Sequence, residues 1–147
     1  MSFRYSFQQI VDLKNNERTQ AEWILSEAMG QLRNEESSLN GLVEQKENLH
    51  KEMIQATSHS VTISNMLMMQ SYMNHVDNQI ARKHQDVKQA KHIVSEKQEH
   101  LSVKMIDEKV WTKAREKAQN KFQIMIAKKE QDALDEMATN RFRRASY

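Results

Sequence analysis

The stretch that decides the fold, residues 21–62, is AEWILSEAMGQLRNEESSLNGLVEQKENLHKEMIQATSHSVT. Apolar residues recur in it at alternating steps of four and three, the period of about 3.5 residues that is typical of a left-handed coiled coil. Only Glu35 and Lys46 interrupt this first repeat, which consists of Ala21, Leu25, Ala28, Leu32, Glu35, Leu39, Leu42, Lys46, Leu49, Met53 and Ala56. We therefore predict a long helix with one face packed against another helix.

The last seven residues of the stretch, 56–62, contain few strong helix formers and several residues that cap helices. Thr62 is the preferred N-cap of a second helix, because its hydroxyl can accept a hydrogen bond from a free N–H group of the first turn; Ser60 is the alternative. A short connection between two long helices favours antiparallel neighbours. We predict a first helix at about residues 5–57, a turn at about 58–62 and a second helix at about 63–140.

A second repeat with the same period follows the turn, with charged residues at five positions. Long charged side chains can lie along a helix interface while their charged ends stay in water. The second repeat consists of Met69, Met73, Val76, Ile80, Lys83, Val87, Ala90, Val94, Lys97, Leu101, Lys104, Glu108, Trp111, Arg115, Ala118, Phe122 and Met125.

The second predicted helix is longer than the first, so about 25 to 30 of its residues extend past residue 112, which faces the start of the first helix. This overhang carries apolar residues, among them Ala118, Phe122, Met125, Leu134 and Met137. An apolar stripe of this kind binds a partner protein, pairs with a second copy of the chain, or frays.

The composition supports an all-α fold in which residues 1–147 form a single antiparallel coiled-coil hairpin. The chain has two glycines and no proline, so little interrupts a long helix. It has no cysteine. Apolar residues make up 38% of the chain, whereas they make up roughly half of a typical compact domain. No apolar run approaches the roughly 18 residues of a membrane span. We expect a soluble, cytoplasmic protein.

The sequence offers no catalytic constellation. The histidines of the second helix are too far apart in the sequence to bind one metal ion, because metal ligands on a single helix must be three or four residues apart. Gly30 and Gly41 stand alone and form no phosphate-binding loop. The six histidines are His50, His59, His75, His84, His92 and His100. We expect no enzyme activity, no metal, no cofactor and no small-molecule substrate.

Charge is uneven along the second helix. The net charge of +2 argues against binding nucleic acid, although Arg141, Arg143 and Arg144 form a short basic group near the end. Eight Lys or Arg residues and three acids lie between Lys104 and Lys129. This segment is either a solvated helix face or a docking surface for an acidic partner.

Three segments resemble the flagellar FliJ family. The first is FRYSFQQIVDLK at 3–14, in which alternating aromatic residues precede an aliphatic helix. The second is QSYMNHVDNQI at 70–80, early in the second helix, and the third is EQDALDEMA at 130–138, followed by Arg141-Phe142. Together the three segments extend the resemblance over essentially the whole chain.

The resemblance implies a non-enzymatic component of the flagellar type III export apparatus, similar to the central stalk of rotary ATP synthases. It implies binding to the hexameric export ATPase, to the export-gate membrane protein and to export chaperones. It also implies a location at the cytoplasmic face of the cell membrane, at the base of the flagellum. We expect a monomer when the chain is alone.

The family's gate-binding surface falls on Tyr72, Val76, Gln79 and Lys83 of this sequence. Tyr72 and Val76 keep the aromatic and aliphatic residue types that the family has at these positions. Gln79 and Lys83 depart from the small residue and the histidine expected there. Val76 and Lys83 also belong to the second repeat, so the pattern leaves open whether they face a partner or the first helix. The facing helix could extend this surface through Leu42, Gln45 and Leu49.

We further hypothesise that the rod inserts its paired ends into the ATPase ring, as a stalk does. The expected ring residues are Phe3, Tyr5, Phe7, Ala118, Phe122, Met125, Leu134, Asp135, Glu136 and Arg141. Three alternatives share the predicted helices: an equivalent stalk of a virulence-type III secretion system, a structural coiled coil that dimerises, and a nucleic-acid-binding rod.

Overall fold

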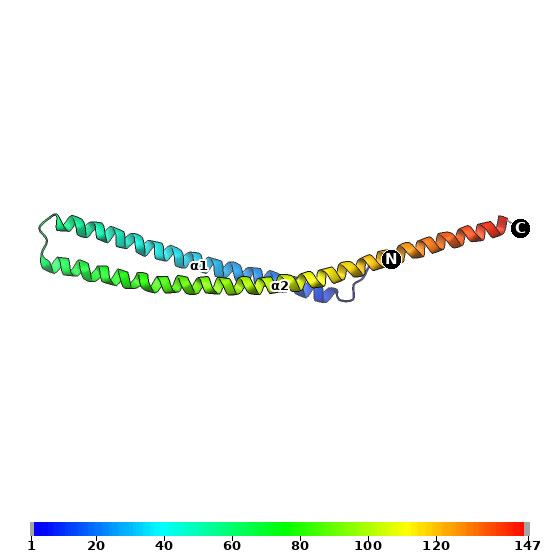
Figure 1. Ribbon diagram of the computed structural model, residues 1–147, viewed down its shortest axis with the longest axis horizontal. Coiled ribbons are helices and arrows are strands. Elements are labelled where there is room, and N and C mark those ends of the chain that lie inside the picture. Colours follow the sequence, from blue (N-terminus) through cyan, green and yellow to red (C-terminus); the bar gives the residue numbers. More distant parts are fainter. Residues whose placement is uncertain (1, 146–147) are drawn as a thin grey trace. The chain divides into compact units, whose positions relative to one another are not determined.

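The chain folds into two helices, seen in a computed structural model that describes residues 2–145. Helix α1 covers Gln8–Thr57 and helix α2 covers Ile63–Ala145 (Figure 1). The described residues contain no strand, and α2 has 83 residues against 50 in α1. These findings confirm the all-α antiparallel hairpin with a longer second helix.

The contacts divide the chain into two units. One unit is Ala21–Leu101, which contains the connection between the helices and is called the turn unit below. The other is Met1–Gln20 with Ser102–Tyr147, called the aromatic unit.

Helix α1 ends through side-chain hydrogen bonds. The hydroxyl groups of Thr57 and Ser58 donate to the carbonyl groups of Ile54 and Gln55, each at 2.7 Å. These carbonyls belong to the last turn, where the helix itself supplies no donor. No described residue other than glycine has a positive φ, so α1 ends without a left-handed residue.

Helix α2 begins with Thr62 as its N-cap, as predicted. The Thr62 hydroxyl accepts a hydrogen bond from the backbone N–H of Asn65 at 3.3 Å, and the Thr62 carbonyl accepts one from the N–H of Met66 at 3.1 Å. One free donor of the first turn is thereby satisfied.

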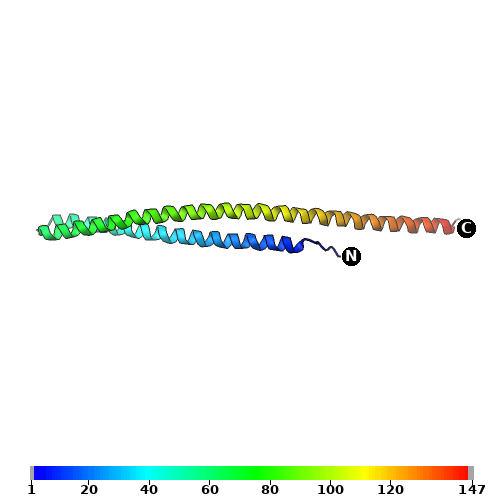
Figure 2. The same cartoon turned by 90° about the horizontal axis from the view of Figure 1, so that it is seen from below.

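Within the turn unit, α1 and α2 lie side by side and antiparallel (Figures 1 and 2). All members of the first repeat except Lys46 are buried or half-buried, and so are all members of the second repeat from Met69 to Leu101. The two repeats therefore form the interface between the helices, which we call the seam. The buried residues of the unit are Ala21, Met73, Val76, Val87, Ala90 and Val94.

Lys46 is the exception to the first repeat. It is exposed and pairs with Asp77 of α2 at 2.8 Å, because its stem is long enough to carry the ammonium group out of the seam.

In the aromatic unit the second repeat continues to face residues 2–20. Its members from Lys104 to Phe122 are half-buried. Helix α1 begins at Gln8, three residues later than the pattern predicts. Helix α2 continues to Ala145, and every described residue after Ile126 is exposed. The exposed end of α2 therefore starts later than the overhang expected from residue 112.

The N-cap gives a direct test of how α2 begins. Replacing Thr62 by Ala removes the acceptor for Asn65 N–H and should lower the free energy of unfolding by about 1 kcal/mol. Urea unfolding followed by circular dichroism measures the change. The matched control is Ser64→Ala, at an exposed position two residues after Thr62. Its free energy of unfolding should stay within about 0.5 kcal/mol of that of the parent chain. Equal effects of the two substitutions would contradict the cap.

Candidate functional site

Tyr72 marks the first candidate site, on the surface of the turn unit. Its side chain is 46% exposed, and its hydroxyl accepts a hydrogen bond from the Gln45 amide of α1 at 2.8 Å. The His75 ring lies 6.4 Å from the Tyr72 ring. The bond across the two helices holds the Tyr72 ring at the edge of the seam.

The other three expected gate residues have different positions. Val76 is fully buried, with 0% exposure, and lies in the seam beneath the surface. Gln79 is exposed. Lys83 is half-buried and pairs with Glu35 of α1 at 2.8 Å and with Asp86 at 3.8 Å.

The ion pair between Lys83 and Glu35 joins a charged position of the second repeat to a charged position of the first. Its hydrogen bond raises the pKa of Lys83 above the ordinary value, against a smaller lowering by burial. Because the pKa of Lys83 is higher in the folded chain than in the unfolded chain, the ion pair stabilises the fold fully at a pH below the unfolded-state pKa of Lys83. This stabilisation is lost as the pH rises through the folded-state pKa. The pair is therefore intact at neutral pH.

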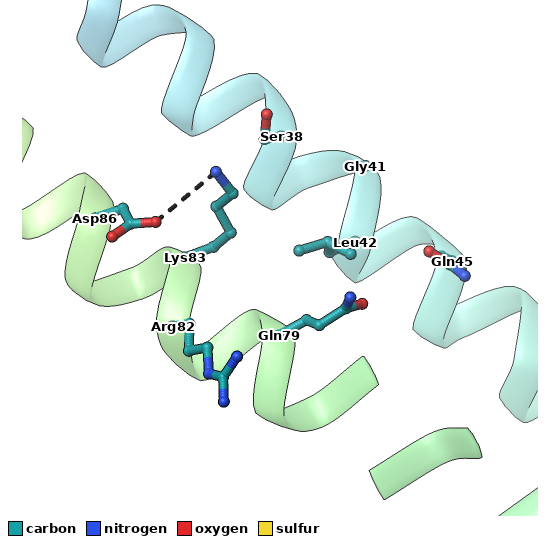
Figure 3. A pocket seen from close by; sticks show the side chains of 8 residues that line it. All are labelled: Ser38, Gly41, Leu42, Gln45, Gln79, Arg82, Lys83 and Asp86. Carbon is teal, nitrogen blue, oxygen red and sulfur yellow. Dashed lines mark ion pairs between the residues drawn. The ribbon is translucent and has the colours of Figure 1, made fainter. Parts of the chain in front are cut away.

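A shallow groove of about 550 Å³ lies between the helices beside Tyr72 (Figure 3). Figure 3 shows Leu42 and Gln79 facing each other across it, with Arg82 pointing away from α1. Gly41 has no side chain, and a Cβ at this position would point into open space with nothing within 4 Å. The wall of the groove is therefore low at Gly41. The lining residues are Ser38, Gly41, Leu42, Gln45, Gln79, Arg82, Lys83 and Asp86. Two of the three facing residues expected from the sequence, Leu42 and Gln45, therefore line the groove, whereas Leu49 does not.

The second candidate site is the aromatic unit, where the segment before α1 packs on α2. The Phe3 ring lies 5.4 Å from the Phe122 ring, and the Phe7 ring lies 6.2 Å from the Trp111 ring. Tyr5 lies between Phe3 and Phe7 and contacts both, at 6.4 Å and 5.7 Å. We call these five residues the aromatic cluster. It explains why α1 starts late, because ring packing of Phe3, Tyr5 and Phe7 replaces a further helical turn.

Arg115 holds the cluster from the α2 side. Its guanidinium group lies 5.8 Å from the centre of the Phe3 ring, and its Nε donates to the side-chain oxygen of Gln8 at 2.7 Å. Trp111 and Arg115 were not among the residues expected to form a site. Their places in the second repeat, opposite the alternating aromatic residues, were the available signal.

Ion pairs fix the pairing of α1 and α2 in the same unit. Lys14 pairs with Asp107 at 2.7 Å, Lys104 pairs with Glu17 at 3.3 Å, and Arg18 pairs with Glu108. The hydrogen bond to Asp107 raises the pKa of Lys14. All six groups keep part of their surface in water, so each pair contributes little stability but favours one register.

The remaining expected ring residues lie along α2. Ala118 is half-buried, and Met125 is 44% exposed at the end of the second repeat. Leu134 is 61% exposed, and Asp135, Glu136 and Arg141 are exposed as well. The structure thus brings Phe3, Tyr5, Phe7 and Phe122 into one cluster and places the last four residues beyond it.

Two features are absent from residues 2–145, a metal-binding group and a membrane-spanning segment. No group of three or more His, Cys, Asp or Glu side chains among them could hold a metal ion. Neither of the described helices has an apolar window long enough to cross a membrane.

The sequence also matches known proteins over nearly its whole length. The pattern that defines the family described as "Flagellar FliJ protein" matches residues 3–146. The chain belongs to the flagellar FliJ family. It is 24% identical to the flagellar FliJ protein of Bacillus subtilis (strain 168) over 142 residues, which cover 97% of each chain. The fold is similar to that of a Chlamydia trachomatis protein described as a YscO homologue, with a TM-score of 0.64, 17% identity and 94% of each chain covered.

Membership of the FliJ family confirms the resemblance carried by the three sequence segments. The family takes part in flagellar type III protein export and is a non-enzymatic component of it. Two surfaces of this FliJ-family chain remain candidates for partner binding. The first, which we call the Tyr72 surface, is formed by Tyr72 and the groove beside it. The second is the aromatic unit with the exposed end of α2.

The aromatic cluster predicts an energetic coupling between Phe3 and Phe122. Their ring contact should appear in a double-mutant cycle of Phe3→Ala and Phe122→Ala as a coupling of about 0.5–1.5 kcal/mol in the free energy of unfolding. A control cycle of Phe3→Ala with Met137→Ala, on the exposed part of α2, should show none. A Phe3–Phe122 coupling of zero would mean that the segment before α1 does not pack on α2 in solution.

Proposed function

We propose that this FliJ-family chain is a stalk of the flagellar type III export apparatus that binds the hexameric export ATPase through its aromatic unit and the export gate through its Tyr72 surface. The observation that carries this proposal is the presence of two separate candidate surfaces on one helical hairpin. A protein with two such surfaces can link two partners without any catalysis of its own.

The aromatic unit suits a ring-binding role because the last segment of its helix is exposed to solvent. All described residues from 127 to 145 are exposed, and they include the apolar side chains of Leu134 and Met137 at 61% and 58% exposure. Exposed apolar side chains of this size favour contact with a partner. The aromatic cluster meanwhile anchors residues 3–7 to α2, which gives the ring one folded surface to bind.

The Tyr72 surface suits the export gate for a different reason. An exposed tyrosine held by a hydrogen bond loses little conformational freedom on binding, and tyrosines are frequent hot spots of interfaces. The adjacent groove offers Leu42 as an apolar contact and Gln79 as a polar one. Val76 contributes from below by supporting the surface, since it has no exposed area.

The proposal extends to export chaperones as partners and to a location at the cytoplasmic face of the cell membrane. Family membership supports both extensions, because the family takes part in type III export. An equivalent stalk of a virulence-type III secretion system would share the fold, as the likeness to the YscO homologue illustrates. The genes that surround the coding sequence distinguish the two systems.

Removal of the residues after Lys117 tests the ring site. This truncation deletes Phe122, Leu134 and Arg141, and it should abolish binding to the purified export ATPase. Tyr72→Ala, as the matched control at the other surface, should leave ATPase binding unchanged. Pull-down of the ATPase with the tagged chain measures both. If the two changes weakened ATPase binding equally, the division into two sites would be wrong.

Tyr72→Ala tests the gate site. Loss of a hot-spot ring should weaken binding to the cytoplasmic part of the export-gate protein by about 1–3 kcal/mol, which titration calorimetry resolves. His84→Ala changes another exposed ring of α2 and should leave this affinity as it was. An unchanged affinity in Tyr72→Ala would remove the gate from this surface.

A further inference from the structure

Helix α2 carries a second apolar stripe in the aromatic unit, on the side away from the seam. Val103, Ile106 and Val110 are 61%, 65% and 61% exposed. Each lies two residues after a member of the second repeat, namely Leu101, Lys104 and Glu108. Two residues turn an α-helix by about 200°, so the stripe points away from residues 2–20.

The same two-residue offset continues along α2. It reaches Lys113, Lys117, Asn120 and Ile124, all of them exposed. We call the surface formed by Val103, Ile106, Val110, Lys113, Lys117, Asn120 and Ile124 the outer face. Its steps of three and four repeat the spacing of a coiled-coil seam, which indicates that the shape it fits is another helix.

Two of the three acids of this segment lie on its inner side, and most of its lysines lie on the outer side. Asp107 and Glu108 are paired on the inner side with Lys14 and Arg18. The lysines of the outer side form no ion pair among the described residues; they are Lys109, Lys113, Lys117, Lys121 and Lys128. The apolar stripe is therefore flanked by an excess of positive charge, with five lysines against Glu116, the one acid of residues 104–129 that is not in the inner pairs.

We propose that the outer face binds an acidic amphipathic helix of a partner protein. Apolar residues of that helix pack on Val103, Ile106 and Val110, and its carboxylates pair with the lysines. The outer face lies in the aromatic unit, but it shares no residue with the aromatic cluster or with the Tyr72 surface. The peptide test below needs neither the ATPase nor the gate, so its outcome is separate from that of the proposed function.

Two other occupants fit the outer face less well. Two copies of the chain packed through this face would bring two sets of lysines together, which is unfavourable. An anionic membrane surface favours helices with Trp, Phe or Leu on the apolar side, whereas this stripe has only Val and Ile.

The test uses the full chain and two synthetic peptides of three heptads. One peptide has Leu at the a and d positions and Glu at the flanking positions, and the other has Lys in place of every Glu. Fluorescence anisotropy of the labelled peptides should show that the Glu peptide binds, with an affinity that falls as salt is added, and that the Lys peptide does not. No binding of the Glu peptide at up to about 1 mM chain would overturn the proposal.

Variants of the outer face make the test specific. The pair Ile106→Asp and Val110→Asp should weaken binding of the Glu peptide at least about tenfold. The pair Lys113→Glu and Lys117→Glu should weaken it too and allow the Lys peptide to bind. As the charge control, Lys88→Glu with Lys91→Glu alters two exposed lysines of the turn unit and should leave binding intact. Circular dichroism confirms that each variant keeps its helices.

Three results would contradict the acidic-helix proposal. One is that the outer-face variants bind the Glu peptide as well as the parent chain does. Another is that the chain binds phosphatidylserine vesicles but not the peptide, and that Ile106→Asp abolishes this. The third is a dimer of the chain in light scattering that Ile106→Asp dissociates.

Discussion

The seam between α1 and α2 is the interaction on which the rest of the structure depends. The buried side chains of the described residues are few, and apart from Met73 they are alanines and valines, with Val76 the most enclosed. Long helices of polar composition are marginal alone, so packing along the seam supplies most of their stability. Register then comes from ion pairs across the two helices, such as Lys83 with Glu35 and Lys14 with Asp107. A shift by one turn would separate these partners.

Much of this arrangement could be predicted from the residue pattern, because a coiled coil records its contacts in its period. The phase of the second repeat turns Val76 inward and leaves Tyr72 outward, as observed. The hydroxyl of Thr62 also marks the start of α2 by local chemistry. The segment before Gln8 could not be predicted this way. The rings of Phe3, Tyr5 and Phe7 pack on α2 there, and their alternation in the sequence does not by itself show that this packing replaces a helical turn.

The candidate sites follow the same logic. The position of Tyr72 at the seam's edge follows from its phase, whereas its hydrogen bond to Gln45 and the groove beside it depend on how two specific side chains meet across the helices. The outer face is visible in the sequence as a stripe two residues out of phase with the second repeat. Only the pairing of Asp107 and Glu108 on the inner side shows that these two acids do not offset its lysines. A FliJ-family hairpin can therefore offer different surfaces to different partners, because each helix has sides that the seam does not use.

The central claim is that a single chain forms this seam in one antiparallel register. The chain has no cysteine, so pairs of introduced cysteines report on it cleanly. A short bismaleimide should join Glu35→Cys to Lys83→Cys, and separately Glu17→Cys to Lys104→Cys, within one molecule, because each pair replaces an ion pair across the helices. Glu35→Cys with Ala90→Cys, displaced by two turns, should not be joined. Cross-linking of the displaced pair, or cross-links found only between molecules, would contradict the account.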